Sequence, residues 1–189
     1  MANESAQSSA LNKIALEVVT PRGKALAVSA DEVTAPSVQG EFGVMPGHLP
    51  LLAALRTGLV TYRQGGETTR VAVGPGFAEV SANKLLILTD HYVEKAQIDP
   101  VIIRKELAEV QGQLAKAVSN GQSLEAGGAG ALPEADALIK QENWLAAQLE
   151  LYGDPPPAAM RPFEQYGPTP PPEDSDTPTD APSDKDEAK

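Results

Sequence analysis

Cysteine is absent from the 189-residue sequence, and aromatic residues make up only 4% of it. Without cysteine the chain can form neither disulfides nor thiolate sites, whether catalytic nucleophiles or zinc ligands of the cysteine type. With so few aromatic rings, the core must consist mostly of Val, Leu, Ile and Ala. The two histidines, His48 and His91, do not form a metal-binding pair such as H-x-x-x-H. We therefore predict no catalytic residue, metal site or cofactor.

Long apolar runs and an excess of positive charge are also missing. No stretch approaches the roughly 20 apolar residues of a membrane span, and the start, MANESAQSSALNK, lacks the apolar core of a secretory signal. The formal charge of −11 disfavours binding to nucleic acid and to anionic lipid. The sequence therefore predicts a soluble, intracellular protein that binds no nucleic acid and does not insert into the membrane.

Negative charge and proline are concentrated at the C-terminal end. Residues 153–189 hold nine acidic against three basic residues, together with ten of the 17 prolines. Such a segment buries too little apolar surface to offset its ordering entropy, so we expect an acidic, Pro-rich, disordered tail. Its charge is interpreted as a contribution to solubility, with binding of a basic partner as the alternative.

Residues 12–97 have the pattern of closely spaced short strands. The expected strands are 13–19, 25–30, 32–35, 59–63, 69–73, 77–80 and 84–89. Tight hairpin connections between successive strands are predicted at Gln64–Glu67 and Ser81–Asn83. Short strands with frequent turns and no interleaved helices indicate an antiparallel sandwich or barrel.

After Ile98 the apolar period changes from that of strands to that of helices. Asp99 is a good N-cap, and Pro100 suits the first helical position. One helical stripe follows, made of Ile103, Leu107, Val110, Leu114 and Val118. A Gly-rich linker at 121–131 precedes a second helix, Pro133–Tyr152, with Ala135, Leu138, Leu145, Leu149 and Tyr152 on one face. Residues 98–152 are therefore predicted as an antiparallel two-helix hairpin, and the whole chain as α+β.

The stretch Gly40–Leu52, "GEFGVMPGHLPLL", concentrates backbone constraints. Gly43 and Gly47 permit positive φ or close backbone approach, and Pro46-Gly47 is a turn dipeptide. Such a rigid, mostly apolar bend can present a binding surface at low entropic cost. A core corner without a partner is the alternative. His48 is interpreted as a turn or interface residue rather than a catalytic one.

Two blocks of sequence resemble the epsilon subunit of bacterial F-type ATP synthases. "GEFGVMPGHLPLLAALRTG" is similar to that family's hallmark segment, and "VAVGPGFAEVSANKLLILTDHYVEKAQID" to the end of its sandwich. The resemblance covers roughly residues 12–152 and implies a β-sandwich followed by a helical hairpin. It implies a non-catalytic rotor subunit of the central stalk, peripheral at the cytoplasmic face of the bacterial inner membrane.

The resemblance also implies partners and contact residues. The gamma subunit and the c ring would bind the stretch Glu41, Phe42, Gly43, Val44, Met45, Pro46, Gly47 and His48. Within it, Glu41 would face the polar loops of the ring, and His48 would lie near the junction of gamma and ring. Leu51, Leu52 and Leu55 would belong to the sandwich core. The C-terminal helices would reach the alpha and beta subunits.

Two regulatory features of the family are altered in this sequence. Members that bind ATP carry Ile-Asp-x-x-Arg-Ala, whereas here the first arginine, Arg104, follows Asp99 by five residues instead of three. Members that block ATP hydrolysis have a basic second helix, but this one has only Lys140 against four acidic residues. We therefore expect no ATP binding by the hairpin, and weak or absent inhibition.

A different class of function fits the same pattern without the resemblance. The chain could be a free-standing β-sandwich binding module whose helical hairpin mediates dimerisation. Co-purification separates the two hypotheses, since a rotor subunit would form a stable complex with gamma, whereas a module would form a homodimer or carry a small ligand. An enzyme would need a convergent polar site, for which the sequence gives no indication.

Overall fold

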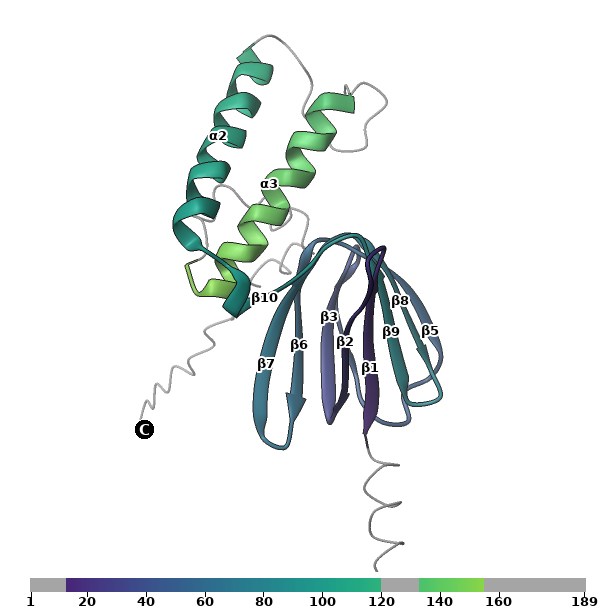
Figure 1. The fold of residues 1–189 in the computed structure, drawn as a ribbon. Helices are drawn as coiled ribbons and strands as arrows, with labels where there is room; N and C mark the ends of the chain where they lie inside the picture. Colours follow the sequence, from purple (N-terminus) through teal and green to yellow (C-terminus); the bar gives the residue numbers. More distant parts are fainter. Residues whose placement is uncertain (1–12, 120–132, 155–189) are drawn as a thin grey trace, which may run out of the picture.

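Strands dominate the first part of the chain and helices the second (Figure 1). The computed structural model describes residues 13–119 and 133–154. The strands are β1 (Ile14–Thr20), β2 (Gly23–Ala30), β3 (Glu32–Ser37), β4 (Gly40–Val44), β5 (Leu51–Leu55), β6 (Gly58–Gln64), β7 (Glu67–Val73), β8 (Gly76–Ser81), β9 (Lys84–Thr89) and β10 (Tyr92–Glu94). The helices are the 3-10 helix η1 (Lys95–Gln97), α2 (Pro100–Ser119) and α3 (Pro133–Tyr152). The linker predicted at 121–131 and the tail from residue 155 onward lie outside the described residues.

The strands follow one another in a continuous sheet that folds into two facing layers. Their order is β10–β7–β6–β3–β5–β8–β9–β1–β2, and β4 pairs with β3. All pairs are antiparallel except β1 with β9, which run parallel from Ala15–Lys84 to Val19–Leu88. The predicted sandwich is confirmed, with this one parallel pair as a departure from an antiparallel arrangement. Local patterns could not predict the pair, because most of the sandwich lies between its two strands in the sequence.

The core lies between the two layers and is almost entirely aliphatic. In β1, Ile14, Leu16 and Val18 are completely buried, and the residues between them are not. Because successive side chains of a strand point to opposite faces, one face of β1 lies in the core and the other faces solvent. Tyr62 is the one aromatic side chain among the buried residues of the described sandwich core. The predicted composition of the core is thus confirmed.

Both predicted hairpin connections are present, and each is a two-residue turn. Gly65 and Gly66 have φ of 59° and 93°, and Ala82 and Asn83 have φ of 44° and 60°. Two-residue hairpins favour positive φ at both central positions, because that twist matches the flanking strands. Glycine adopts it freely and asparagine tolerates it, whereas Ala82 adopts it at a steric cost.

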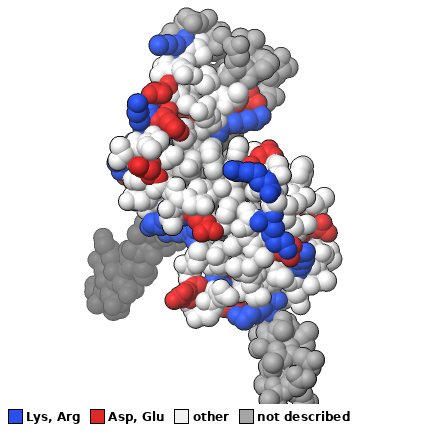
Figure 2. Space-filling view, in the orientation of Figure 1, with Lys and Arg blue, Asp and Glu red and all other residues white. Residues whose placement is uncertain are grey.

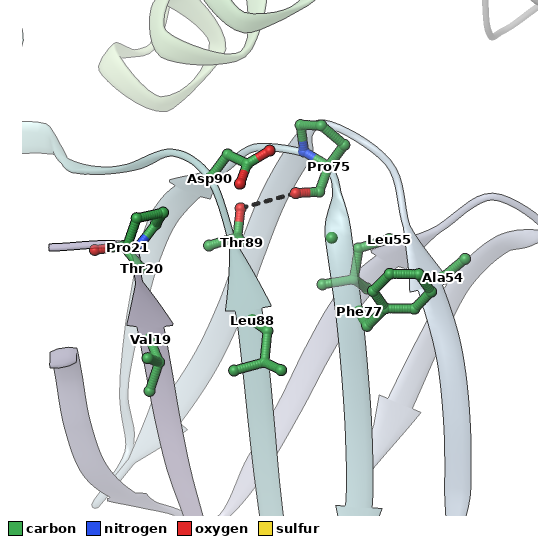
Figure 3. A pocket seen from close by; sticks show the side chains of 11 residues that line it. Val19, Thr20, Pro21, Ala54, Leu55, Pro75, Phe77, Leu88, Thr89 and Asp90 are labelled. Atoms are coloured by element: carbon green, nitrogen blue, oxygen red, sulfur yellow. Dashed lines mark hydrogen bonds between the residues drawn. The ribbon is translucent and has the colours of Figure 1, made fainter. Parts of the chain in front are cut away.

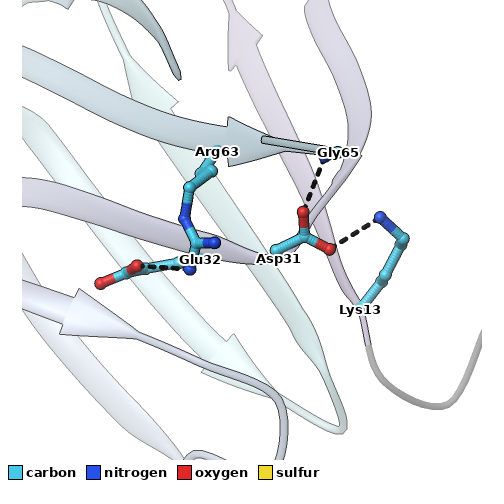
Figure 4. A network of polar contacts seen from close by, with 5 residues as sticks. All are labelled: Lys13, Asp31, Glu32, Arg63 and Gly65. Atoms are coloured by element: carbon cyan, nitrogen blue, oxygen red, sulfur yellow. Dashed lines mark hydrogen bonds and ion pairs between the residues drawn. The ribbon is translucent and has the colours of Figure 1, made fainter. Parts of the chain in front are cut away.

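A polar network holds three chain segments together (Figure 4), at the end of the sandwich that lies far from the helices in Figure 1. The Asp31 carboxylate, between β2 and β3, accepts hydrogen bonds from Lys13 Nζ at 2.7 Å and from the Gly65 N–H at 2.8 Å. The Lys13 ammonium, with help from the Gly65 N–H, lowers the pKa of Asp31. Beside it, Arg63 pairs with Glu32 at 3.0 Å. The network fixes the start of β1 and the β6–β7 turn against the β2–β3 turn.

The helix boundaries follow the predicted signals. The Asp99 carboxylate caps α2 by accepting hydrogen bonds from the N–H groups of Val101 at 2.9 Å and Ile102 at 3.4 Å. Gly153, with φ of 106°, ends α3. The two helices pack through a shared cluster, consisting of Leu107, Val110, Leu114, Ile139, Leu145 and Leu149 with Ile103 and Leu138 against it. The predicted hairpin is confirmed, although the side chain of Val118 lies outside the described part.

Tyr152, which was predicted to share one face of α3 with the apolar residues, lies outside the helix–helix contact. Its side chain is 40% exposed, because it lies in the last turn of α3, past the apolar cluster shared with α2. The ammonium of Lys95 in η1 lies 5.7 Å from the centre of its ring. Tyr152 therefore contacts the connection between sandwich and hairpin instead.

The hairpin packs against the sandwich through α3. Ala147 and Leu151 of α3 are buried against Ala72 of β7 and Ile98. Trp144 stacks on His91, with ring centroids 5.2 Å apart and ring planes at 28°. The hairpin thus covers part of the layer that contains β6 and β7. In the described ranges, no helix is long and apolar enough to cross a membrane.

Candidate partner-binding surfaces

The stretch expected to form a single rigid bend consists of two strands and a loop. Gly40–Val44 forms β4, which pairs with β3, and Leu51–Leu55 forms β5, which pairs with β8. Residues 45–50 connect them. The prediction of one bend was wrong because glycine and alanine, which are poor strand formers, make up nearly half of these two strands. Pairing with neighbouring strands outweighs that low propensity.

The loop begins with a tight turn at Pro46-Gly47, as predicted. The His48 N–H donates to the Met45 carbonyl at 3.0 Å, and Gly47 has φ of 82°, which together define a type II turn. The Gly47 N–H donates to Asn83 Oδ1 at 2.7 Å, which fastens the turn to the β8–β9 hairpin. Gly43, in contrast, has neither a positive φ nor a close neighbour, so that part of the prediction was wrong.

The eight predicted contact residues differ in their accessibility. Exposed members are Glu41, Gly43, Met45, Gly47 and His48, and Pro46 is partly exposed. Phe42 is half-buried and packs against the core, and Val44 is 1% exposed within it. The alternation along β4 explains this difference, because Phe42 and Val44 point inward. The side chain of Val44 is therefore not available to a partner.

The structure does not bring these residues together into one site. Glu41 lies near the start of β4, opposite Pro36 of β3, and the turn with His48 follows the other end of the strand. At about 3.3 Å per residue, Glu41 and the end of β4 are about 10 Å apart. Nδ1 of His48 lies 2.6 Å from the Leu49 carbonyl oxygen, a local contact. Glu41 and His48 are thus candidates for two different contacts.

Leu52 corrects the expectation for the apolar residues that follow the loop. Leu55 is buried as predicted, and Leu51 packs against the core, but Leu52 is 72% exposed. The side chains of β5 alternate, so Leu52 and Ala54 point away from the core. They belong to an outer surface that sequence reasoning missed.

This surface, termed the open face here, is the outer side of β1, β9, β8 and β5. Its first row runs directly across the four strands, as Val19, Leu88, Phe77 and Ala54. Its second row, two residues further along each strand, is Glu17, Leu86, Glu79 and Leu52. Phe77 is 57% exposed and Leu88 47%. Six of the eight side chains are apolar, which is unusual for a solvent-facing sheet surface.

One end of the open face forms a groove next to the β1–β2 turn and the β7–β8 turn (Figure 3). Phe77 and Leu88 lie side by side on neighbouring strands, and Val19 and Leu55 contribute further apolar lining. The Thr89 hydroxyl donates to the Pro75 carbonyl at 3.2 Å and closes the upper edge. Thr20, Thr89 and Asp90 are the polar side chains of the lining, and the others are apolar, so the groove suits an apolar side chain of a partner.

An apolar run within β9 is a local sequence signal for the open face. Leu85–Leu88 is a continuous apolar run within a strand. An antiparallel strand with one wet face alternates apolar and polar residues, so a continuous run indicates that both faces are covered. In the view of Figure 2, charges of both signs are interspersed with broad uncharged areas. Apolar side chains, rather than charges of one sign, make up most of the open face.

The residues considered for nucleotide binding already have other partners. Arg104 forms an ion pair with Asp154, with Nε 2.7 Å from Oδ2, which joins the start of α2 to the end of α3. Asp99 is occupied as the helix cap. Within residues 13–119 and 133–154, no group of three or more acidic or histidine side chains could hold a metal ion.

The fold and these surfaces define a β-sandwich subunit with a docked helical hairpin. Residues 13–95 match the β-sandwich domain of the ATP synthase delta/epsilon chain. The chain is 38% identical over 113 residues to the ATP synthase epsilon chain of Anaeromyxobacter sp. (strain K), covering 60% of this chain and 86% of that one. It is 42% identical over 101 residues to the epsilon chain of Nitratidesulfovibrio vulgaris (strain DP4), covering 53% and 75%.

A solved structure has the same fold. A chain in the Euglena gracilis mitochondrial ATP synthase assembly of OSCP, F1 and c ring matches with a TM-score of 0.56 and 20% identity. The match covers 73% of this chain and 82% of that one. The protein belongs to the family of ATP synthase epsilon chains, the non-catalytic subunits of the central stalk. The resemblance seen in the two sequence blocks is thereby confirmed.

Proposed function

We propose that this chain is a rotor subunit that joins the gamma subunit to the c ring and couples ion flow to ATP synthesis. The open face carries the proposal, because it is a broad apolar surface on a protein of the epsilon-chain family. Permanent subunit contacts are more apolar than transient ones, and a rotor that transmits torque needs permanent contacts. The subunit would then be peripheral at the cytoplasmic face of the bacterial inner membrane.

Gamma is the partner that we assign to the open face. Phe77, Leu88 and Leu52 project from three adjacent strands and would fill shallow pockets on an apolar partner. The loop with Met45 and His48 leads directly into β5, so its exposed side chains would extend the same contact. The rigid sheet beneath loses little conformational entropy on binding.

The c ring is the partner that we assign to the start of β4. Glu41 is exposed there, and Val38, 65% exposed, lies in the adjoining β3–β4 turn. This strand pairs with β3 and is not one of the four strands of the open face, although the Val38 N–H in the adjoining turn donates to the Ala54 carbonyl of β5 at 3.0 Å. A charged, solvent-accessible edge suits the polar loops of the ring better than an apolar sheet face does. The two assignments let one small domain bridge two partners.

The hairpin is proposed to inhibit ATP hydrolysis weakly or not at all. Lys140, the single basic residue of α3, already pairs with Asp136 at 2.6 Å. The remaining acidic residues would oppose approach to acidic segments of the alpha and beta subunits. Deleting residues 100–189 should leave ATP hydrolysis by the assembled complex nearly unchanged. A several-fold rise in hydrolysis would show that the hairpin is an effective inhibitor.

Binding to purified gamma tests the main assignment. Phe77→Ser removes an exposed ring without disturbing the core, and should weaken binding roughly tenfold or more if Phe77 anchors the contact. Val101→Ser is the matched control, since Val101 is 70% exposed on α2. If Phe77→Ser binds gamma with the same affinity as wild type, the assignment of gamma to the open face is wrong.

Coupling tests the ring assignment. Glu41→Lys reverses an exposed charge and should weaken attachment to the c ring while the isolated subunit stays folded. The loss would appear as reduced proton- or sodium-driven ATP synthesis in membranes with normal gamma binding. Unchanged coupling would count against Glu41 as a contact residue.

A further inference from the structure

Glu79 differs from the other charged residue of the open face. It lies in the second row, directly between Leu52 on one side and Leu86 on the other. Within β8, Phe77 is the neighbouring side chain on the same face, in the direction of the groove. Glu79 is exposed and has no ion pair within residues 13–119 and 133–154. An unneutralised carboxylate thus lies inside a mostly apolar surface.

Glu17, in the same row, is already neutralised. Lys24 Nζ lies 3.2 Å from its Oε1, and Lys84 Nζ lies 3.0 Å from its Oε2. Hydrogen bonds from these two ammonium groups, Lys84 first, lower the pKa of Glu17. The subunit therefore supplies cations for one carboxylate of the row and leaves the other without one. A partner that covers both meets an unpaired carboxylate at Glu79, whereas two ammonium groups already face the carboxylate of Glu17.

We propose that the surface of gamma that covers the open face presents a lysine or arginine side chain to Glu79. This inference rests on the proposed docking of gamma to that face. Covering Leu52, Phe77 and Leu86 with apolar groups would remove water from the carboxylate between them. A carboxylate that loses its water without gaining a cation opposes binding, whereas a paired one fixes the register of the two surfaces.

A different role for Glu79 predicts the opposite result. The carboxylate could serve only to keep an apolar sheet surface soluble before assembly. In that case its burial against gamma would be unfavourable, and a neutral side chain of the same shape would bind more tightly. If a neutral residue at position 79 weakens the binding of gamma, Glu79 is a recognition contact. If it strengthens the binding, Glu79 serves only to keep the free subunit soluble.

The experiment measures association and dissociation rates of the full chain with purified gamma at low and moderate salt. Glu79→Gln keeps the shape and removes the charge, and we expect dissociation about 10–100 times faster with a smaller change in the association rate. Glu79→Arg should weaken binding further. Glu67→Gln, at the exposed start of β7, is the matched control and should bind like wild type. Far-UV circular dichroism of each variant checks that the fold is retained.

Three outcomes would overturn the inference. Glu79→Gln could bind as tightly as wild type or more tightly, which excludes a cation opposite Glu79. It could change only the association rate and its salt dependence, which would place Glu79 at a wet rim. Phe77→Ser could leave affinity unchanged, which would refute the docking of gamma to this face as well. If Phe77→Ser weakens binding and Glu79→Gln does not, only the charge pairing is wrong.

Discussion

Replacing Gly76 with alanine should separate the two strands that carry the open face. Gly76 lies at the start of β8, opposite Thr89 of β9. A Cβ built there would lie 1.9 Å from the Leu88 carbonyl oxygen and 2.9 Å from its carbonyl carbon. A relaxed contact between carbon and oxygen is about 3.3 Å, so the backbones would have to move apart by about 1.4 Å. Neither neighbour is the end of a flexible side chain that could turn aside.

The expected cost follows from this displacement. Overpacking of a well-packed site costs about 1–3 kcal/mol, and loss of a ladder hydrogen bond adds about 1 kcal/mol. We therefore expect Gly76→Ala to lower the free energy of unfolding by about 3 kcal/mol. For a denaturation slope of about 1–3 kcal/mol per molar urea, the midpoint should fall by about 1–3 M.

Urea denaturation followed by far-UV circular dichroism is the assay. Gly43→Ala is the matched control, because Gly43 also lies in a strand but has ordinary φ and nothing within 4 Å of an added Cβ. Its midpoint should stay close to that of wild type. If Gly76→Ala and Gly43→Ala unfold at the same urea concentration, the close approach of β8 and β9 does not restrict residue 76 to glycine.

Two further predictions concern the docking of the hairpin. His91→Ala removes the ring that stacks on Trp144 and should weaken the contact of α3 with the sandwich by about 0.5–1.5 kcal/mol. The fluorescence of Trp144, the single tryptophan, reports the loss of this contact directly. An unchanged emission spectrum would contradict the prediction. Burial raises the pKa of Glu142 above its ordinary value of 4.5, while its hydrogen bond from Gln111 acts in the opposite direction. The ionised carboxylate therefore lowers the free energy of unfolding of the hairpin at neutral pH. This destabilisation disappears as the pH falls below 4.5 and the carboxylate becomes protonated. Glu142→Gln should unfold at higher urea than wild type at pH 7, with a difference that shrinks towards pH 4; a difference independent of pH would refute the reasoning.

The helices and several strands could be predicted because their signals are local. Asp99 and Pro100 mark a helix start, and a single apolar stripe follows. Strands β1, β7 and β9 are rich in β-branched or aliphatic residues. The strands β4 and β5 were missed because Gly43, Ala53 and Ala54 have low strand propensity, and pairing with β3 and β8 decides their structure instead.

The binding surfaces could be predicted only in part. The turn at Pro46-Gly47 follows from residue types that favour one backbone geometry. The open face depends on which side of each strand points outward, and a one-residue change of register reverses that assignment. Leu52 and Leu55 are chemically identical and three residues apart, yet one is exposed and the other buried. The pairing of β1 with β9, which places Val19 beside Leu88, is a long-range contact that no local pattern contains.

Cysteine labelling in the assembled ATP synthase is the direct test of whether the open face and the start of β4 contact partner subunits. Because the chain has no cysteine, Leu52→Cys, Glu41→Cys and Glu67→Cys each introduce a single thiol into it. All three positions are exposed in the isolated subunit, so a maleimide should label them at similar rates there. In the assembled enzyme, we expect strong protection at positions 52 and 41 and none at 67. Labelling of position 52 as fast as position 67 would contradict the docking of gamma on the open face.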